Sequence, residues 1–558
     1  QEHIAQAFFF YRKCAPVVCD RVGVLLSTSE SGREQYARQL SSSTSLAVSL
    51  HLDGAPKSPE ATELALTTVL RRKGRVLDAT SHARQQLVAK LTPDNKVKLD
   101  RLSTLHTQIA RLQFSGLGNQ TIEQYQTRLL PLESESYALE EQLARSSAAF
   151  RVEAEPVSIG AVQAMLPENA ALIEFVLYQP FDATVPTDER LGTPRYAAYV
   201  LNSQGLPEGI DLGEVEEIDA LISSLRRGLS TGSMRSLISD SEALYEKLVA
   251  PLEPFLEDKS HLLLSPDGQL NLIPFNALIN PDGDYLIERY QMSYLTSGRD
   301  LLKLDLDLDI SSQQPPLILA NPTYETNPAH GSSVVADSAS NGQRSVDAEA
   351  LSFNPLPGTA EEVLAIAPFM PNATVFTEAN ATESHIKQAQ SPSILHIATH
   401  GFFLPDVELI SSNLENPLLR SGLALAGANN RSSGTEDGIF TALEASSLNL
   451  HGTQLVVMSA CATGLGTVSN GEGVYGLRRA FAIAGAESQL MSLWQADDYG
   501  TSQLMQMFYQ NMMEKGQSRG EALRDAQLAL MKTDGYAHPH HWSTFILSGD
   551  WRSLENID

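Results

Sequence analysis

Two stretches of this chain, SILHIATHGFF at 393–403 and QLVVMSACATGLG at 454–466, decide how the rest is interpreted. Each begins with a run of apolar, β-forming residues that is typical of a strand buried on both faces of a sheet. The first run ends at His400 and the second at Cys461. Because groups that follow parallel strands collect at one edge of a sheet, we expect His400 and Cys461 to lie side by side there.

A thiol beside an imidazole is the arrangement of a nucleophile and its base. A free thiol titrates near ~8.5, and an adjacent imidazole takes its proton or stabilises the thiolate. We therefore predict Cys461 as the nucleophile and His400 as the base. The backbone N–H groups of Gly401 and Cys461 are the predicted oxyanion hole. A lone cysteine or histidine at a strand end is usually a core residue, and the pairing of two such ends favours catalysis.

Working outward, short apolar runs alternate with amphipathic helical patterns, which predicts an α/β fold with helices on both faces of a sheet. The strand-like runs are at 171–178, 196–202, 206–213, 261–268, 316–321, 373–377 and 487–494, besides the two quoted above. The helical patterns between them are at 215–228, 239–257, 359–368, 382–390, 473–484, 500–515 and 518–532.

The first part of the chain has a different pattern. Apolar residues recur at helical spacing at 60–76, 96–112 and 121–145, which predicts amphipathic helices packed on each other. We expect a helical region at 1–151, of tetratricopeptide-like or helical-hairpin type, that binds a protein partner. Two α/β domains are expected to follow, at 152–310 and 311–558, the second with a flexible loop at 325–350.

Composition narrows the class of protein. The net charge of −27 and the pI near 4.9 argue against nucleic acid as a partner, which requires a basic surface. The 558 residues contain three cysteines, Cys14, Cys19 and Cys461, so we expect a reducing cytoplasm rather than a disulfide-stabilised secreted protein. No run of 18 or more apolar residues occurs, so no membrane association is expected. The first residue is Gln1, so we expect a trimmed N-terminus.

His396, four residues before His400, allows an alternative interpretation as a zinc hydrolase. Both side chains would point to the same face of a strand. A catalytic zinc needs three protein ligands, and His385 is the histidine close by in sequence that could supply the third. A core role for His396 is favoured, and we expect neither a metal nor a cofactor.

Further motifs resemble one family. They are RKGRVLDA (72–79), LLLSPDGQLNLIPFNAL (262–278), LPGTAEEV (356–363), DGIFTALEASSLNL (437–450), GEGVYGLRRAFAIAGA (471–486) and SLWQADD (492–498), together with the two quoted stretches. This set resembles the CHAT domain family, caspase-like cysteine proteases that often accompany tetratricopeptide repeats. The chain also resembles cyanobacterial regulators of the HetF type.

The resemblance implies a caspase-like sheet flanked by helices, with an inactive protease half at 152–310 and an active half at 311–558. It implies the same roles for His400 and Cys461. It also places SLWQADD beside the first specificity pocket, with Trp494, Asp497 and Asp498 as pocket residues. Carboxylates there would pair with a basic residue before the scissile bond.

The alternative for Asp497 and Asp498 is that they cap the following helix, where acids are also favoured. We assign no catalytic role to Asp437 or Glu444, although either could orient a loop. Two functions remain open. The first is a regulatory cysteine endopeptidase acting on a protein substrate, in which partner binding orders the loop at 464–473. The second is a non-catalytic scaffold that keeps the fold.

Overall fold

The described part of the chain begins with the helical region. The computed structural model describes residues 42–89, 92–115, 120–148, 157–182, 184–186, 189–304, 312–325, 351–404, 416–460, 463–495 and 497–555. After a helical segment at 42–49 and a π-helix at Leu50–Gly54, the helices are α4 (Pro59–Arg72), α5 (Arg75–Ala89), α6 (Pro93–Phe114) and α7 (Ile122–Ala148). The helices predicted at 96–112 and 121–145 are confirmed as α6 and α7. The expected loop at 325–350 lies almost entirely outside the described residues.

The prediction of one helix over 60–76 is wrong, because the chain breaks between α4 and α5. Ser58 starts α4, where its side chain accepts a hydrogen bond from the Ala61 N–H and Pro59 occupies the first turn. Lys73 is extended, and Gly74 then adopts a φ of +64°. A left-handed residue ends the α-helical hydrogen-bond pattern, so α5 starts as a new helix.

One large sheet runs through the molecule. Its strands are β1 (Ala170–Tyr178), β2 (Arg195–Asn202), β3 (Glu208–Glu214), β4 (His261–Ser265), β5 (Gln291–Tyr294), β6 (Leu317–Pro322), β7 (Thr374–Glu378), β8 (Ile394–Thr399), β12 (Leu455–Ala460), β15 (Ser488–Ser492) and β16 (Phe545–Gly549). The central strands β4, β8, β12 and β15 are buried along their whole length, as their apolar runs predict.

The strand order is β3-β2-β1-β4-β5-β16-β15-β12-β8-β6-β7. Strand β16 joins the two halves, because it runs antiparallel to β15 and pairs in parallel with β5 through Ser548 and Tyr294. The expected boundary at residue 310 falls between β5 and β6, so the two expected α/β domains share one continuous sheet. Whether they are separate folding units stays a prediction.

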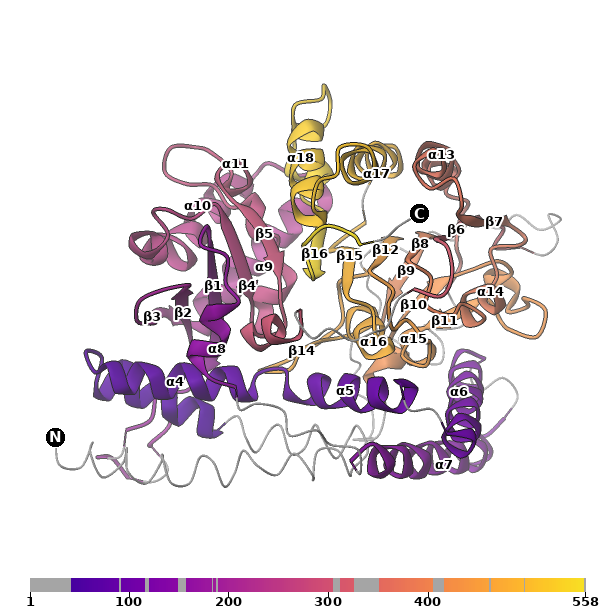
Figure 1. The fold of residues 1–558 in the computed structure, drawn as a ribbon, viewed down its shortest axis with the longest axis horizontal. Coiled ribbons are helices and arrows are strands. Elements are labelled where there is room, and N and C mark those ends of the chain that lie inside the picture. Colours follow the sequence, from indigo (N-terminus) through magenta and orange to yellow (C-terminus); the bar gives the residue numbers. More distant parts are fainter. Residues whose placement is uncertain are drawn as a thin grey trace.

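Helices cover both faces of this sheet (Figure 1). On one side, α13 (Pro357–Ile366) packs on α17 (Asp498–Met513), and α17 packs on α18 (Arg519–Met531). On the other side, α16 (Leu477–Ala484) packs against α5, and α15 (Ala442–Ala445) against α6. The remaining helices are α8 (Ile159–Ala164), α9 (Val215–Thr231), α10 (Leu237–Leu248), α11 (Leu286–Arg289), α14 (Glu383–Lys387) and α19 (Pro539–Trp542). Helices α4 and α5 follow one another across the lower part of Figure 1, beneath both halves of the sheet.

Two smaller sheets lie beside the second half. One contains β9 (Gly401–Phe403), β10 (Ser421–Ala424) and β11 (Ile439–Thr441), in the order β11-β10-β9. The other is a hairpin of β13 (Thr467–Ser469) and β14 (Gly473–Tyr475). The helix predicted at 473–484 therefore starts only at Leu477, because Gly471 and Gly473 adopt positive φ and form the hairpin turn.

Within the described residues, no helix combines the length and the apolar character needed to cross a membrane.

Candidate active site

The two strands that precede His400 and Cys461 are neighbours in the sheet. Strands β8 and β12 pair in parallel, and Thr399 lies opposite Ala460 at their carboxyl ends. In the sequence, His400 comes directly after the last residue of β8, and Cys461 comes directly after the last residue of β12. The predicted arrangement of the strands is confirmed. Cys461 and Ala462 lie outside the described residues, so the contact between sulfur and imidazole stays a prediction.

The imidazole of His400 is held by a segment that lies upstream in sequence. Its Nε2 is 2.7 Å from the backbone carbonyl oxygen of Asn354. Because a carbonyl oxygen only accepts, Nε2 carries the proton in the neutral ring, and Nδ1 is the basic nitrogen. The rings of Tyr324 and Phe353 lie 5.3 and 5.6 Å from the His400 ring, measured between centroids. In the site, His400 Nε2 is thus held by a hydrogen bond, and Nδ1 is the nitrogen that can accept a proton.

Burial also sets the protonation of His400. Loss of solvent lowers the pKa of His400 below its ordinary 6.5, and the hydrogen bond to the Asn354 carbonyl partly offsets this effect. The imidazole is therefore neutral at pH 7, which is the form that accepts a proton.

Asn429 fixes the segment that contacts His400. Its side-chain carbonyl accepts a hydrogen bond from the Phe353 N–H at 2.8 Å, and its amide group donates to the Phe353 carbonyl at 2.9 Å. Sequence reasoning missed both Asn354 and Asn429. Asn354 acts through its backbone carbonyl, a group that every residue has, so its identity gives no signal. Asn429 lies in a short 3-10 helix, Ala428–Asn430, outside the motifs quoted above.

His396 lies in the core beneath the site, as expected from the sequence. It is fully buried, and its Nδ1 is 3.0 Å from the Tyr509 hydroxyl on α17. Its Nε2 is 3.0 Å from the Glu362 carboxylate on α13, at ion-pair distance but without hydrogen-bond alignment. The Ser459 hydroxyl on β12 donates to the same carboxylate at 2.8 Å. Both nitrogens of His396 thus face protein groups, which argues against a shared zinc ion with His400.

His385, the expected third zinc ligand, also has other partners. Its ring stacks on Phe376 at 3.7 Å, and its Nδ1 lies 2.8 Å from the Asn380 carbonyl oxygen. These contacts hold His385 on α14, so the zinc interpretation has no support among the described residues.

Among the residues of SLWQADD, Asp497 fits the helix-capping alternative. Asp497 is the N-cap of α17, where its carboxylate accepts from the Gly500 N–H at 2.7 Å. Trp494 is 5% exposed, and its indole N–H donates to the His540 carbonyl. Asp498 is half-buried; burial, then the charges of Asp497 and Glu362, raise the pKa of its carboxyl. The pocket role of all three stays a prediction.

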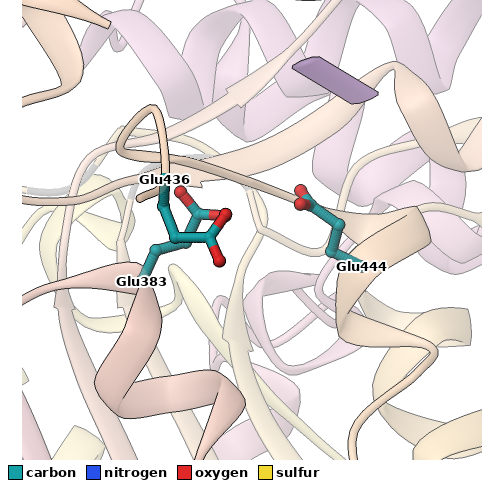
Figure 2. Close-up of side chains that lie close together, drawn as sticks. All are labelled: Glu383, Glu436 and Glu444. Atoms are coloured by element: carbon teal, nitrogen blue, oxygen red, sulfur yellow. The ribbon is translucent and has the colours of Figure 1, made fainter. Parts of the chain in front are cut away.

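Three glutamates gather beside the small sheet (Figure 2). Ligand oxygens of Glu383, Glu436 and Glu444 lie within 4.8 Å of one another. The Lys387 Nζ lies 2.8, 3.1 and 2.9 Å from their carboxylates. Burial opposes the charge on Lys387, but the carboxylates of Glu444 and Glu383 outweigh it and raise the pKa of the amine. An ammonium group thus takes the place that a metal ion would need, and the cluster is structural.

The two acids that the sequence suggested as loop-orienting residues are both hydrogen-bonded to backbone. Glu444 completes a capping box at the start of α15 with Thr441. Asp437 accepts from the Ile439 N–H at 2.9 Å, at the start of β11.

One cavity lies at the other end of the sheet from His400. It measures about 920 Å³ and lies between α5 and the residues that precede β12 and β15. His82, Gln454 and Glu487 contribute to its lining. Active groups of parallel sheets collect at the carboxyl ends of the strands, so we assign this cavity no part in the site.

Comparison with known families agrees with the motifs. The CHAT domain model matches residues 239–550, which is more than half of the chain and includes both His400 and Cys461. The chain belongs to the CHAT domain family. The match begins within the first α/β half, so the CHAT domain extends across the junction between β5 and β16.

Two curated relatives match this CHAT protein. Tetratricopeptide repeat protein 28 of Homo sapiens is 25% identical over 334 residues, covering 55% of this chain and 13% of the human protein. The protein of the same name from Mus musculus is 24% identical over 340 residues, with the same coverage. The chain therefore spans about one eighth of the length of these relatives.

Solved structures show distant similarity to the CHAT protein. The Arg-specific cysteine proteinase gingipain R matches 61% of this chain and 75% of its own, with 11% identity and a TM-score of 0.32. The Saccharomyces cerevisiae separase–securin complex matches 93% of this chain and 40% of its own, with 10% identity and a TM-score of 0.42.

Proposed function

We propose that this CHAT protein is a cysteine endopeptidase in which His400 activates the thiol of Cys461. The observation that carries the proposal is the parallel pairing of Thr399 with Ala460, the residues immediately before the histidine and the cysteine. The carbonyl of Asn354 adds support, because it leaves Nδ1 of His400 as the nitrogen that accepts a proton.

The proposed reaction uses these groups in sequence. Nδ1 of His400 takes the proton of the Cys461 thiol, and the thiolate attacks the carbonyl carbon of the scissile bond. The imidazolium gives this proton to the departing amine as the C–N bond breaks, which leaves a thioester on Cys461. A water molecule, deprotonated by the same imidazole, then hydrolyses the thioester and restores the thiol. The N–H groups of Gly401 and Cys461 would stabilise the oxyanion in both halves of the reaction.

A cleavage experiment with a matched control tests this proposal. The full chain and its Cys461→Ala variant are incubated with a peptide library, and cut sites are mapped by mass spectrometry. In parallel, an electrophilic peptide is used to label the thiol at Cys461. We expect the parent chain to cleave peptides and to be labelled at Cys461. The Cys461→Ala variant should neither cleave nor be labelled. Identical cut sites in both proteins, or no labelling of the parent with any activating partner, would favour the scaffold.

The pH dependence supplies a second test. Only the neutral imidazole accepts the thiol proton, and burial lowers the pKa of His400 below 6.5. We expect the labelling rate to be retained at pH 6.5 and to fall only when the pH drops through this lowered value. A His400→Ala variant should lack this acidic limb. An acidic limb centred above 6.5, or one that persists in the variant, would contradict the role of His400.

We further propose that the substrate carries a basic residue before the scissile bond. Asp498 is the candidate that could contact it, because its carboxyl is half-buried beside the charges of Asp497 and Glu362. A guanidinium or ammonium group would compensate this concentration of negative charge. The net charge of −27 would also attract basic peptides.

Paired substitutions separate this role from helix capping. Asn caps a helix about as well as Asp, so Asp497→Asn and Asp498→Asn should both keep α17 intact. We expect Asp498→Asn to lower kcat/KM for peptides with Arg at this position by about 10- to 100-fold, which is the effect of losing about 1.5–3 kcal/mol of a charged hydrogen bond. Peptides with a neutral residue should be cut at an unchanged rate. Equal losses for both kinds of peptide would refute basic specificity.

A further inference from the structure

The motif RKGRVLDA (72–79) joins the helical region to the sheet. The Lys73 Nζ is buried and donates to the backbone carbonyls of Phe175 at 2.7 Å and Ser265 at 2.6 Å, and it pairs with Glu174 at 3.1 Å. Gly74 has a φ of +64°, and a Cβ atom there would overlap the Thr296 side chain. The break between α4 and α5 is thus fixed against strands β1 and β4 and the end of β5.

The loop that follows Cys461 rests on this junction. Its hairpin, β13–β14, carries Gly471 and Glu472 at its turn. The Gly74 N–H donates to the Gly471 carbonyl at 2.6 Å, and the Val76 N–H donates to the Glu472 carboxylate at 3.1 and 3.3 Å. Residues at the first turn of α5 therefore hold the turn of this hairpin.

The first half of the sheet holds the same turn from another side. The Gly471 N–H donates to the Asp267 carboxylate at 2.7 Å, and the same carboxylate accepts from Leu177 N–H at 2.9 Å. Three segments that are distant in sequence therefore meet at the hairpin turn.

The charge and burial of Glu472 make this contact energetically important. Glu472 is 5% exposed, and its carboxylate lies at the N-terminus of α5, where the unpaired N–H groups favour a negative charge. The guanidinium of Arg479 lies 3.9 Å away. A buried carboxylate would be costly without these donors, so the hairpin turn and α5 stabilise each other.

The hairpin is connected closely to the nucleophile. At the start of the loop, the Gly464 N–H donates to the Ser492 carbonyl at 2.7 Å, at the end of β15. A Cβ atom at Gly466 would overlap the Tyr475 backbone, so the base of the hairpin is tightly packed. The described part of the loop is thus tightly packed from Gly464 to the turn, which leaves little slack chain to absorb a displacement of the turn.

We propose that Gly74 and Val76 of the helical region position the loop after the nucleophile, with Glu472 as the contact residue. This inference rests on the proposed cysteine peptidase and names the part of the chain that controls its site. The protease half is then incomplete without the junction at 72–76. A protein that changes the angle between α4 and α5 alters the reactivity of Cys461 through the hairpin.

The test uses full-length chains with Glu472→Ala and, as a matched control, Glu521→Ala. Glu521 also accepts a backbone N–H at a helix start, that of Ser518 before α18, but α18 lies on the opposite side of the sheet from the hairpin. Two rates are measured: hydrogen exchange of backbone amides in peptides covering 463–476, and labelling of Cys461 by an electrophilic peptide. A third chain, Glu472→Gln, keeps an acceptor oxygen without the charge.

We expect Glu472→Ala to speed hydrogen exchange in this loop by about tenfold or more, which corresponds to about 1.4 kcal/mol, and to slow Cys461 labelling by a similar factor. Glu472→Gln should show smaller changes in the same directions. If Glu472→Ala does not fold, the exchange and labelling rates of Glu472→Gln test the inference instead. Glu521→Ala should change neither rate. The inference is overturned if the loop exchanges at the parental rate, or if it exchanges faster while labelling is unchanged.

The two measurements also separate this inference from the proposed function. If the parent chain is not labelled at Cys461 under any condition, the peptidase proposal fails. The exchange rates still decide whether α5 holds the hairpin, because they do not depend on catalysis.

Discussion

Replacing Lys387 with Met would remove the cation from the glutamate cluster beside the small sheet. Lys387 is 18% exposed, and Glu383 and Glu444 are 1% and 3% exposed, so solvent screens these pairs little. Removing one partner of a buried ion pair costs about 3–5 kcal/mol. The lower end applies here, because other donors remain: the Gly438 N–H for Glu383, and the N–H and hydroxyl of Thr441 for Glu444.

The cost of this substitution should depend on pH. Burial, followed by the charge of Glu444, raises the pKa of Glu383 well above its ordinary value of 4.5. Without the ammonium group this pKa rises further, so the folded variant binds a proton more tightly than the unfolded chain does. Such a group favours folding at low pH, and this contribution is lost as the pH rises through the folded pKa. The destabilisation should therefore be smaller at pH 5 than at pH 7.5.

The assay is urea unfolding at both pH values, with Lys98→Met as the control. Lys98 forms an exposed pair with Asp94 on α6, and such pairs contribute about 0.3–0.5 kcal/mol. We expect Lys387→Met to be about 3 kcal/mol less stable than Lys98→Met at pH 7.5, with a smaller gap at pH 5. A gap below about 1 kcal/mol, or one independent of pH, would refute the reasoning. Because β11 begins three residues after Glu436 and belongs to the same sheet as Gly401, Cys461 labelling should also slow.

Two further substitutions test packing around the sheet. Tyr509→Phe leaves His396 Nδ1 buried without its hydroxyl partner, and should lower the free energy of unfolding by about 1–3 kcal/mol in thermal melts; an unchanged melting temperature would show that the contact contributes nothing. Gly485→Ala combines a φ of +107° with overlap of His451, whereas Gly516→Ala meets open space at a φ of +67°. We expect the Gly485 variant to lose about 2 kcal/mol or more and the Gly516 variant about 1 kcal/mol; equal losses would exclude the overlap as a cause.

Local patterns predicted most of the elements, and they erred where glycine acts through tertiary contacts. The buried runs that became β8 and β12 are continuous apolar segments, and such runs fit a strand covered on both faces. The stretch at 60–76 has unbroken helical spacing, yet it divides at Gly74, where φ is +64° and a Cβ atom would overlap the Thr296 side chain. Trp494 is buried and its indole N–H donates to the His540 carbonyl on α19, while its role in a pocket stays a prediction.

The sequence by itself determined the fold class, the family and the two strands that end at His400 and Cys461, because apolar runs and motifs are local properties of the chain. Only the tertiary structure decided that the Asn354 carbonyl leaves Nδ1 of His400 basic and that α5 holds the hairpin turn at Glu472. Those contacts involve backbone groups from distant segments. Every residue has the same backbone N–H and C=O, proline's missing N–H aside, so the sequence carries no mark of which ones will meet.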